Sequence, residues 1–294
     1  MSILSAADRE HFLAHGFVKV PAAVDPDLLK SWVDLMWVRM GYDPADPSTW
    51  TEGKIHMPSI NHAKVAEVAP KAWAAICELC GGAERIQPAG WSDAFIANFH
   101  YGDDQPWVPP TPAAKGWHKD GDFFRHFLDS PEQALLTIVL WTDVLPRGGA
   151  TFLAADSVGP VARYLAQHPE GILPKHGYEG LPYDDLLAQC SDFREATGQA
   201  GDVYLMHPFV LHASSYNALR RPRLITNPPV HFLEPMRFDR PRFEDHCLVE
   251  QAILRALGTD RFAFTPTAPR ERIVPERVKR QALLKEQELA RLKR

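Results

Sequence analysis

An imidazole and a carboxylate stand two residues apart in the segment KGWHKDGDFF, residues 115–124, as His118 and Asp120. In an extended strand the side chains of residues i and i+2 point to the same face, so the two groups converge if residues 117–121 are extended. A local hydrogen bond and joint ligation of a metal ion both account for this spacing. The pattern alone does not decide, because the chain repeats it as His168-Pro-Glu170 near a predicted helix end, where we interpret it as structural.

A second set of polar residues follows in GDVYLMHPFVLHASSYNALRRPRL, residues 201–224. His212 and Ser214 are two residues apart on one predicted strand and share a face, and Arg223 begins the next strand after a turn. An arginine is costly to bury unless an anion meets it. His207 is the nearest rival to His212, but it lies five residues upstream, so strict alternation points it to the opposite face. We therefore favour His212.

Two histidines and one carboxylate on one face are the ligand set of non-haem Fe(II) oxygenases. His118, Asp120 and His212 as ligands leave three positions of an octahedral iron open, and a 2-oxo acid fills two of them. Its far carboxylate then needs a planar cation, which Arg223 supplies, and Ser214 donates a further hydrogen bond. O2 takes the last position. Two other classes stay open: a protein that binds a metal or a small acid without redox chemistry, and a zinc-type hydrolase with the same three ligands.

The elements that position these residues are short. Ser5 and Asp8 form a predicted capping box before a helix, and Asp25-Pro26 reads as the start of a second helix that ends before Gly41. Residues 1–83 are mainly helical by pattern, apolar strands bounded by Gly, Pro, Asp or Asn dominate from about 84 to 235, and helices return in 236–294. This order predicts an α+β fold, one domain over 1–294, with a sandwich or barrel at its centre.

Composition excludes several classes. The 294 residues carry a net charge of −5, which disfavours nucleic acid as a partner. We see no apolar run of about 20 residues that would cross a membrane, and no secretory signal. Four cysteines do not make a disulfide framework in so long a chain, so we expect a cytoplasmic protein. The charged last twenty residues predict a helix that is either solvated or packed in a homodimer.

The chain resembles the phytanoyl-CoA dioxygenase-like family of Fe(II)/2-oxoglutarate-dependent oxygenases. The resemblance is carried by FLAHGFVKVP, WHKD, IVLWTDVLPRGGATFLAADS and HASSYNALRRPR, and covers most of residues 10–232. It implies a double-stranded β-helix core, also called a jelly roll or cupin-like fold. It further implies iron at His118, Asp120 and His212.

By the same resemblance, Arg223 and Ser214 hold the distal carboxylate of 2-oxoglutarate, and Trp141 and Asn98 lie near this cosubstrate. The expected reaction is O2-dependent hydroxylation of a small molecule with release of succinate and CO2. Related halogenases have a small residue in place of Asp120, so the carboxylate favours hydroxylation, or desaturation or cyclisation in natural-product metabolism. Lys119 and Arg125 close to the metal segment suggest a small polar acid as substrate.

Overall fold

The computed structural model describes residues 2–174 and 180–292. Helix α1 (Ala6–His15) begins at the capping box of Ser5 and Asp8, and the left-handed residue Gly16 ends it. Helix α2 (Pro26–Met40) begins after Asp25, whose side chain accepts the hydrogen bond of Leu28 N, and ends at Gly41. Both helix starts predicted from the sequence are confirmed, since capping depends on residues that are adjacent in the chain.

The strands form antiparallel sheets, and the fold is α+β. The largest sheet has the order β1-β9-β6-β11-β5-β2, with β12 also paired to β6. A second sheet has the order β10-β7-β8, and β3 pairs with β4. The strands are β1 (Phe17–Val20), β2 (Lys54–His56), β3 (His62–Lys64), β4 (Gly90–Ser92), β5 (Ile96–Asn98), β6 (Leu135–Leu140), β7 (Thr151–Ala154), β8 (Phe193–Ala196), β9 (Val203–Met206), β10 (Leu211–Ser214), β11 (Arg223–Thr226) and β12 (Pro229–Val230).

Two strands of the large sheet lie before residue 84, in the part that the sequence pattern predicts to be mainly helical. Strand β1 pairs with β9, and β2 pairs with β5, so the N-terminal part supplies both outer strands of the large sheet. Strand β8 pairs with β7 in the smaller sheet. Strand β2 is only three residues long and half-buried, and its pattern is therefore too short to indicate a strand.

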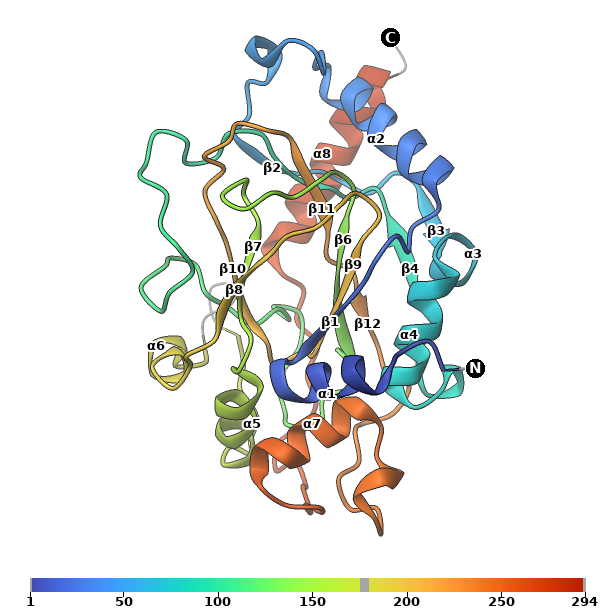
Figure 1. Cartoon of the computed structure of the whole chain (residues 1–294), viewed down its shortest axis with the longest axis vertical. Coiled ribbons are helices and arrows are strands. Elements are labelled where there is room, and N and C mark those ends of the chain that lie inside the picture. The colour runs from blue at the N-terminus through green and yellow to red at the C-terminus, as the bar shows by residue number, and fades with distance from the viewer. Residues whose placement is uncertain (1, 175–179, 293–294) are drawn as a thin grey trace.

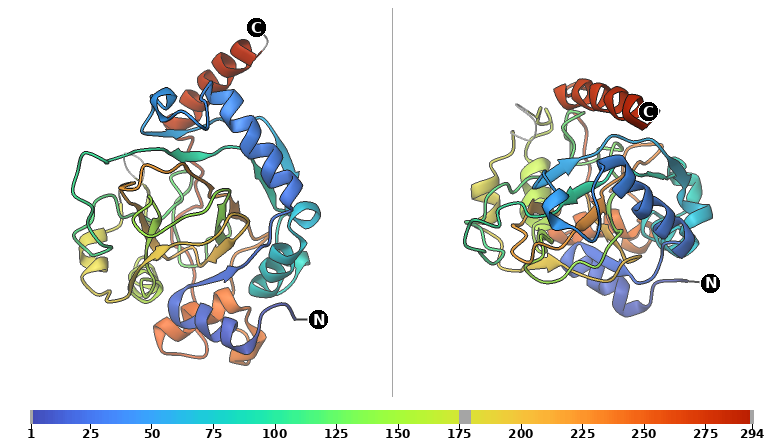
Figure 2. Two further views of the ribbon diagram at one scale, coloured as in Figure 1. Left: turned by 45° about the horizontal axis from the view of Figure 1, so that its top comes forward. Right: turned by 90° about the horizontal axis from the view of Figure 1, so that it is seen from above.

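Helices cover the ends and the outside of the sheets. The remaining helices are α3 (Val65–Val68), α4 (Pro70–Cys80), α5 (Val158–Ala166), α6 (Tyr183–Leu187), α7 (Leu248–Leu257) and α8 (Glu276–Leu292), with 3-10 turns at Pro47–Thr49, Ala83–Arg85 and Phe243–Asp245. Figure 1 shows α1, α5 and α7 gathered at one end of the strands. Helix α8 lies along the outside of the molecule, behind the strands in Figure 1 and at the upper edge of the right-hand view in Figure 2.

The core lies around the central strands of the large sheet. Every residue of β6 and β9 is buried, as expected for strands with a neighbour on both sides. Trp141, just after β6, stacks on Trp32 of α2 with ring centroids 5.0 Å apart, which packs that helix against the sheet. No helix in the described residues is long and apolar enough to span a bilayer.

Candidate metal centre and active site

His118, Asp120 and His212 meet at one point. His118 lies in a loop, but its backbone pairs with that of His212 on β10 through N–H···O bonds of 2.9 and 3.0 Å. This pairing places the two rings side by side, with centroids 4.4 Å apart. Ligand atoms from all three residues lie within 4.8 Å of one another. The structure thus brings together the three residues that the sequence pattern singled out.

Hydrogen bonds fix how the two imidazoles face the carboxylate. Nδ1 of His118 lies 2.7 Å from the carbonyl oxygen of Gly116, and Nδ1 of His212 lies 3.1 Å from that of Val210. A ring nitrogen next to a carbonyl oxygen carries the proton, so Nε2 of each neutral ring keeps its lone pair. Both Nε2 atoms point toward Oδ1 of Asp120, at 3.3 Å from His118 and 3.4 Å from His212.

The donor set fits a divalent metal ion. Asp120 Oδ1 and His212 Nε2 are buried and have no hydrogen-bond partner in the described part of the chain, which is unusual for buried polar atoms. The other carboxylate oxygen, Oδ2, accepts a hydrogen bond of 3.0 Å from Nδ2 of Asn227. Burial opposes the charge of Asp120, but without a metal the positive charge of protonated His212, and then of His118, would hold its pKa well below the usual value. A metal ion between the three residues would satisfy the two atoms that lack partners.

Lys119 points away from this centre, as strand-like alternation predicts. Its Nζ lies 2.9 Å from Nδ1 of His126 and donates to Oε1 of Gln133 at 3.2 Å. Burial lowers the pKa of Lys119 to about 7. Arg125 also turns away, because it pairs with Glu271 at 2.9 Å.

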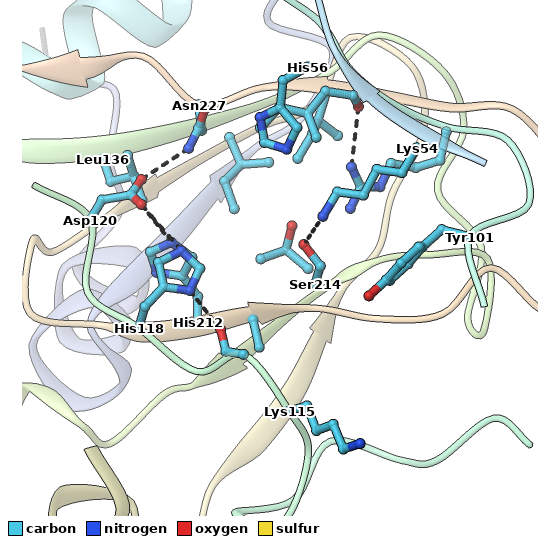
Figure 3. A pocket seen from close by; sticks show the side chains of 17 residues that line it. Lys54, His56, Tyr101, Lys115, His118, Asp120, Leu136, His212, Ser214 and Asn227 are labelled. Carbon is cyan, nitrogen blue, oxygen red and sulfur yellow. Dashed lines mark hydrogen bonds and ion pairs between the residues drawn. The ribbon is translucent and has the colours of Figure 1, made fainter. Parts of the chain in front are cut away.

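The metal centre lines a cavity of about 380 Å³ between the two larger sheets. The large sheet contributes Lys54 and His56 (β2), Ile96 (β5), Leu136 and Ile138 (β6), and Arg223 and Ile225 (β11); the smaller sheet contributes Thr151 (β7) and His212, Ala213 and Ser214 (β10). Tyr101 and Lys115, from the intervening loop, complete it beside Gly116, His118, Asp120 and Asn227. Figure 3 shows Asp120, His118 and His212 at one side of this cavity and Lys54 and Ser214 at the other.

Arg223 is a buried cation in this cavity. It is 1% exposed, and its guanidinium donates to the carbonyl oxygens of Gly149 (2.6 Å) and Ile96 (3.3 Å). No carboxylate among the described residues pairs with it. Burial lowers its pKa to about 10, and no attraction to an acidic group offsets this. A guanidinium that is positioned by backbone oxygens but lacks an anion is prepared for an external carboxylate.

Lys54 is a second cation at the same end, which the sequence analysis missed. Its Nζ donates to Oγ of Ser214 at 2.7 Å and lies 5.3 Å from the ring centroid of Tyr101. Burial, together with the nearby charge of Arg223, lowers the pKa of Lys54 to about 8. Burial also lowers the pKa of His56 to about 4, and the charges of Lys54 and then Arg223 add to this effect. The only sequence pattern that pointed to Lys54 was its spacing of two residues from His56, in a segment without a clear hydrophobic period.

Trp141 and Asn98 are not among the residues that line the cavity. In β6 the side chains of Leu136 and Ile138 face the cavity, so the odd-numbered Trp141 faces the opposite side, where its Nε1 donates to Oγ1 of Thr226 at 3.0 Å. Asn98 lies opposite Arg223 in the register of β5 and β11, and its Oδ1 accepts from Tyr101 N at 3.1 Å. Trp141 therefore lies behind the cavity wall. Asn98 stands two residues from Ile96 and opposite both Arg223 and Lys54 in register, so it shares the cavity-facing side of β5, and its role near the cosubstrate stays a prediction.

The rival residues lie elsewhere. His207 is fully buried, with Nε2 3.2 Å from the carbonyl oxygen of Val249, and burial lowers its pKa to about 3. His168 stacks on Tyr164 with ring centroids 4.0 Å apart.

No protein-family model and no curated protein matches the chain, so its resemblance to the phytanoyl-CoA dioxygenase-like family stays a prediction. Solved structures similar to it include the epimerase SnoN in complex with Fe3+, alpha ketoglutarate and nogalamycin RO, at 15% identity over 92% of this chain and 96% of that one (TM-score 0.46). EctD from S. alaskensis with bound Fe is 17% identical over 78% and 77% (0.49). HygX from Streptomyces hygroscopicus with nickel and 2-oxoglutarate is 13% identical over 78% and 87% (0.44). No residue's role follows from likenesses at this level.

Proposed function

We propose that this protein is a non-haem Fe(II)- and 2-oxoglutarate-dependent oxygenase with a double-stranded β-helix core. One observation carries the proposal: a largely buried His-Asp-His site, in which Asp120 Oδ1 and His212 Nε2 lack partners, shares a cavity with the cations Arg223 and Lys54, and neither cation has a carboxylate partner among the described residues. A metal site and an anion site in one cavity match a ligand that chelates the metal at one end and carries a carboxylate at the other.

The protein's own part in the reaction is to bind and orient. His118 and His212 would offer Nε2, with their Nδ1 protons held by backbone oxygens, and Asn227 would keep one carboxylate oxygen of Asp120 turned toward the metal. Bound iron would supply O2 activation, which couples oxidation of a substrate C–H bond to decarboxylation of 2-oxoglutarate into succinate and CO2. Ile96, Leu136 and Ile138 limit water in the cavity.

The far carboxylate of 2-oxoglutarate would lie between Arg223, Lys54 and Ser214. The guanidinium supplies parallel donors, Lys54 supplies a second charge, and the Ser214 hydroxyl, which accepts from Lys54, keeps its own proton to donate. This arrangement selects an oxo-diacid over a 2-oxo acid with an apolar tail, because the tail would leave two buried cations unpaired.

Hydroxylation is the reaction we favour, since Asp120 occupies the third ligand position with a carboxylate. Desaturation and cyclisation use the same site and are the alternative. The two cations behind the expectation of a small polar acid as substrate do not line the cavity, because Lys119 is directed into the core and Arg125 is paired with Glu271.

The two other classes meet the same observation differently. A non-catalytic metal-binding protein or a zinc-type hydrolase with these three ligands would not account for the two buried cations, Arg223 and Lys54. Neither class needs a buried site that binds the carboxylate of a ligand. The buried Arg223 beside Lys54 therefore favours the oxygenase.

The test is anaerobic addition of Fe(II) and 2-oxoglutarate, followed by O2. We expect a weak visible charge-transfer band, then succinate. Replacement of the buried arginine by Arg223→Met should remove both signals at concentrations that saturate the wild type, whereas Arg221→Met, at an exposed arginine two residues away, should leave them intact. Air-stable hydrolysis with zinc, or no band in the wild type at any 2-oxoglutarate concentration, would reject the proposal.

A further inference from the structure

A second chamber of about 350 Å³ adjoins the metal centre. It shares with the first cavity the five residues His56, Ile96, Asp120, Leu136 and Asn227. Figure 3 shows Asp120 and Asn227 on the side of the first cavity that is remote from Lys54 and Ser214. The first cavity and the second chamber therefore meet at the carboxylate of Asp120. The second chamber lies away from the end of the first cavity that carries Lys54 and Arg223.

The chain after residue 270 runs beside the segment that follows Asp120. Ile273 N donates to the carbonyl oxygen of Phe123 at 2.8 Å, and Arg125 N donates to that of Glu271 at 2.9 Å. Arg277, in the first turn of α8, then makes two parallel bonds of 2.6 Å to the buried carboxylate of Asp122. The segment that follows Asp120 thus contacts a part of the chain more than 140 residues away in the sequence.

Helix α8 is held in place beyond this point. Gln281 Nε2 donates to the carbonyl oxygen of His56 at 3.0 Å. Glu288 is 5% exposed and pairs with Arg39 of α2, which is itself fully buried and bonded to Asp93 at 2.8 Å. Buried charges are costly unless they are paired, so this contact requires a fixed helix. The interpretation of the charged C-terminus as a fully solvated helix is therefore wrong for one of its faces.

The second chamber has a mixed lining without uncompensated charge. Apart from the metal ligand, its charged residues are Asp122 and Arg277, which neutralise each other. Its apolar surface comes from Phe123, Leu136 and the Pro228-Pro229 pair, and Ser92, Gln133 and Asn227 add polar groups. Its volume is near the lower end of the roughly 300–1,000 Å³ that small-molecule sites span.

We propose that this second chamber receives the organic substrate, that the C-terminal segment with α8 is its outer wall, and that the substrate is a compact molecule without net charge. The inference rests on the proposed function, because the oxo-diacid occupies the cationic end of the first cavity and leaves this approach to the metal. An uncharged molecule with an apolar body and hydroxyl or amide groups complements the lining. A substrate with a net charge would meet no unpaired opposite charge there.

The test uses the full chain loaded with Mn(II) and 2-oxoglutarate, since the paramagnetic ion speeds the relaxation of nearby ligand protons without turnover. Three ring compounds of matched size serve as probes: cyclohexanecarboxamide, cyclohexanecarboxylate and cyclohexylmethylammonium. We expect the uncharged amide to be relaxed most strongly. The variant Ala94→Phe, which fills the chamber, should weaken its binding at least about tenfold, whereas Ala113→Phe, at an exposed loop residue, should not.

A second variant tests the wall. Asp122→Asn combined with Arg277→Met removes both partners of the ion pair, so no buried charge is left unpaired. We expect about tenfold weaker amide binding with an unchanged Fe(II)–2-oxoglutarate band. Stronger relaxation of a charged probe, relaxation of none, or unaltered amide binding in either chamber variant would overturn the inference. Loss of the band in the wild type would instead reject the proposed function, so the two failures are distinguishable.

Discussion

Lys54 gives the sharpest prediction, because its charge state is set by the cavity. Its ammonium group donates to Ser214 at 2.7 Å, and burial with the neighbouring Arg223 lowers its pKa from 10.5 to about 8. A bound dianion favours the protonated lysine and so raises this pKa again. Binding of 2-oxoglutarate above pH 8 must therefore take up a proton, and the affinity falls as the pH rises through the pKa of the free protein.

The size of the effect follows from these values. At pH 7 most Lys54 side chains in the free protein carry the proton, whereas at pH 9 about one in ten does, so the dissociation constant of 2-oxoglutarate should rise about tenfold. The variant Lys54→Met loses a charge-assisted hydrogen bond worth about 2 kcal/mol, which weakens binding about 30-fold at pH 7. It should also remove the pH dependence between 7 and 9.

Anaerobic titration of the Fe(II) protein with 2-oxoglutarate, followed by the visible band at pH 7 and pH 9, measures both effects. Lys54→Arg should restore most of the affinity for 2-oxoglutarate, and this affinity should not change between pH 7 and pH 9, because a guanidinium keeps its proton. Lys115→Met, at an exposed lysine beside the same cavity, should change the affinity by less than about fivefold. Equal wild-type affinity at the two pH values, or tight binding by Lys54→Met, would refute the assignment of Lys54 to the carboxylate site.

Three further outcomes follow from the contacts described. Asp120→Ala should abolish turnover of 2-oxoglutarate without substrate, and undiminished succinate formation would contradict a metal role for this carboxylate. Asn227→Ala should weaken Fe(II) binding about 10- to 100-fold in a competition titration, because the Asp120 carboxylate loses the donor that orients it; affinity equal to the wild type would count against this role. Arg39→Met should lower the free energy of unfolding by about 3–5 kcal/mol in urea, since Asp93 and Glu288 would face each other without a cation. Glu288→Gln should lower the free energy of unfolding much less, because Arg39 keeps its ion pair with Asp93. A decrease as large as that of Arg39→Met would show that the cluster is not built as described.

Sequence alone predicted the features that depend on local geometry. The caps at Ser5 and Asp25 are set by residues within one turn of helix, and the two-residue period of an extended chain puts His118 with Asp120 and His212 with Ser214 on common faces. The same period shows why Trp141 faces away from the cavity, since it stands an odd number of residues from Leu136. The order of elements likewise predicted an α+β fold.

Contacts between distant segments were decided only by the tertiary structure. Lys54 belongs to a three-residue strand that owes its place to pairing with β5, and Asn227 reaches Asp120 across 107 positions of the chain. The position of α8 depends on the ion pairs that its residues Arg277 and Glu288 form with Asp122 and Arg39. No sequence pattern indicates these pairs. The physical reason is that alternation and capping act between neighbours in the chain, whereas strand register and buried ion pairs are fixed only when the sheets and helices pack together.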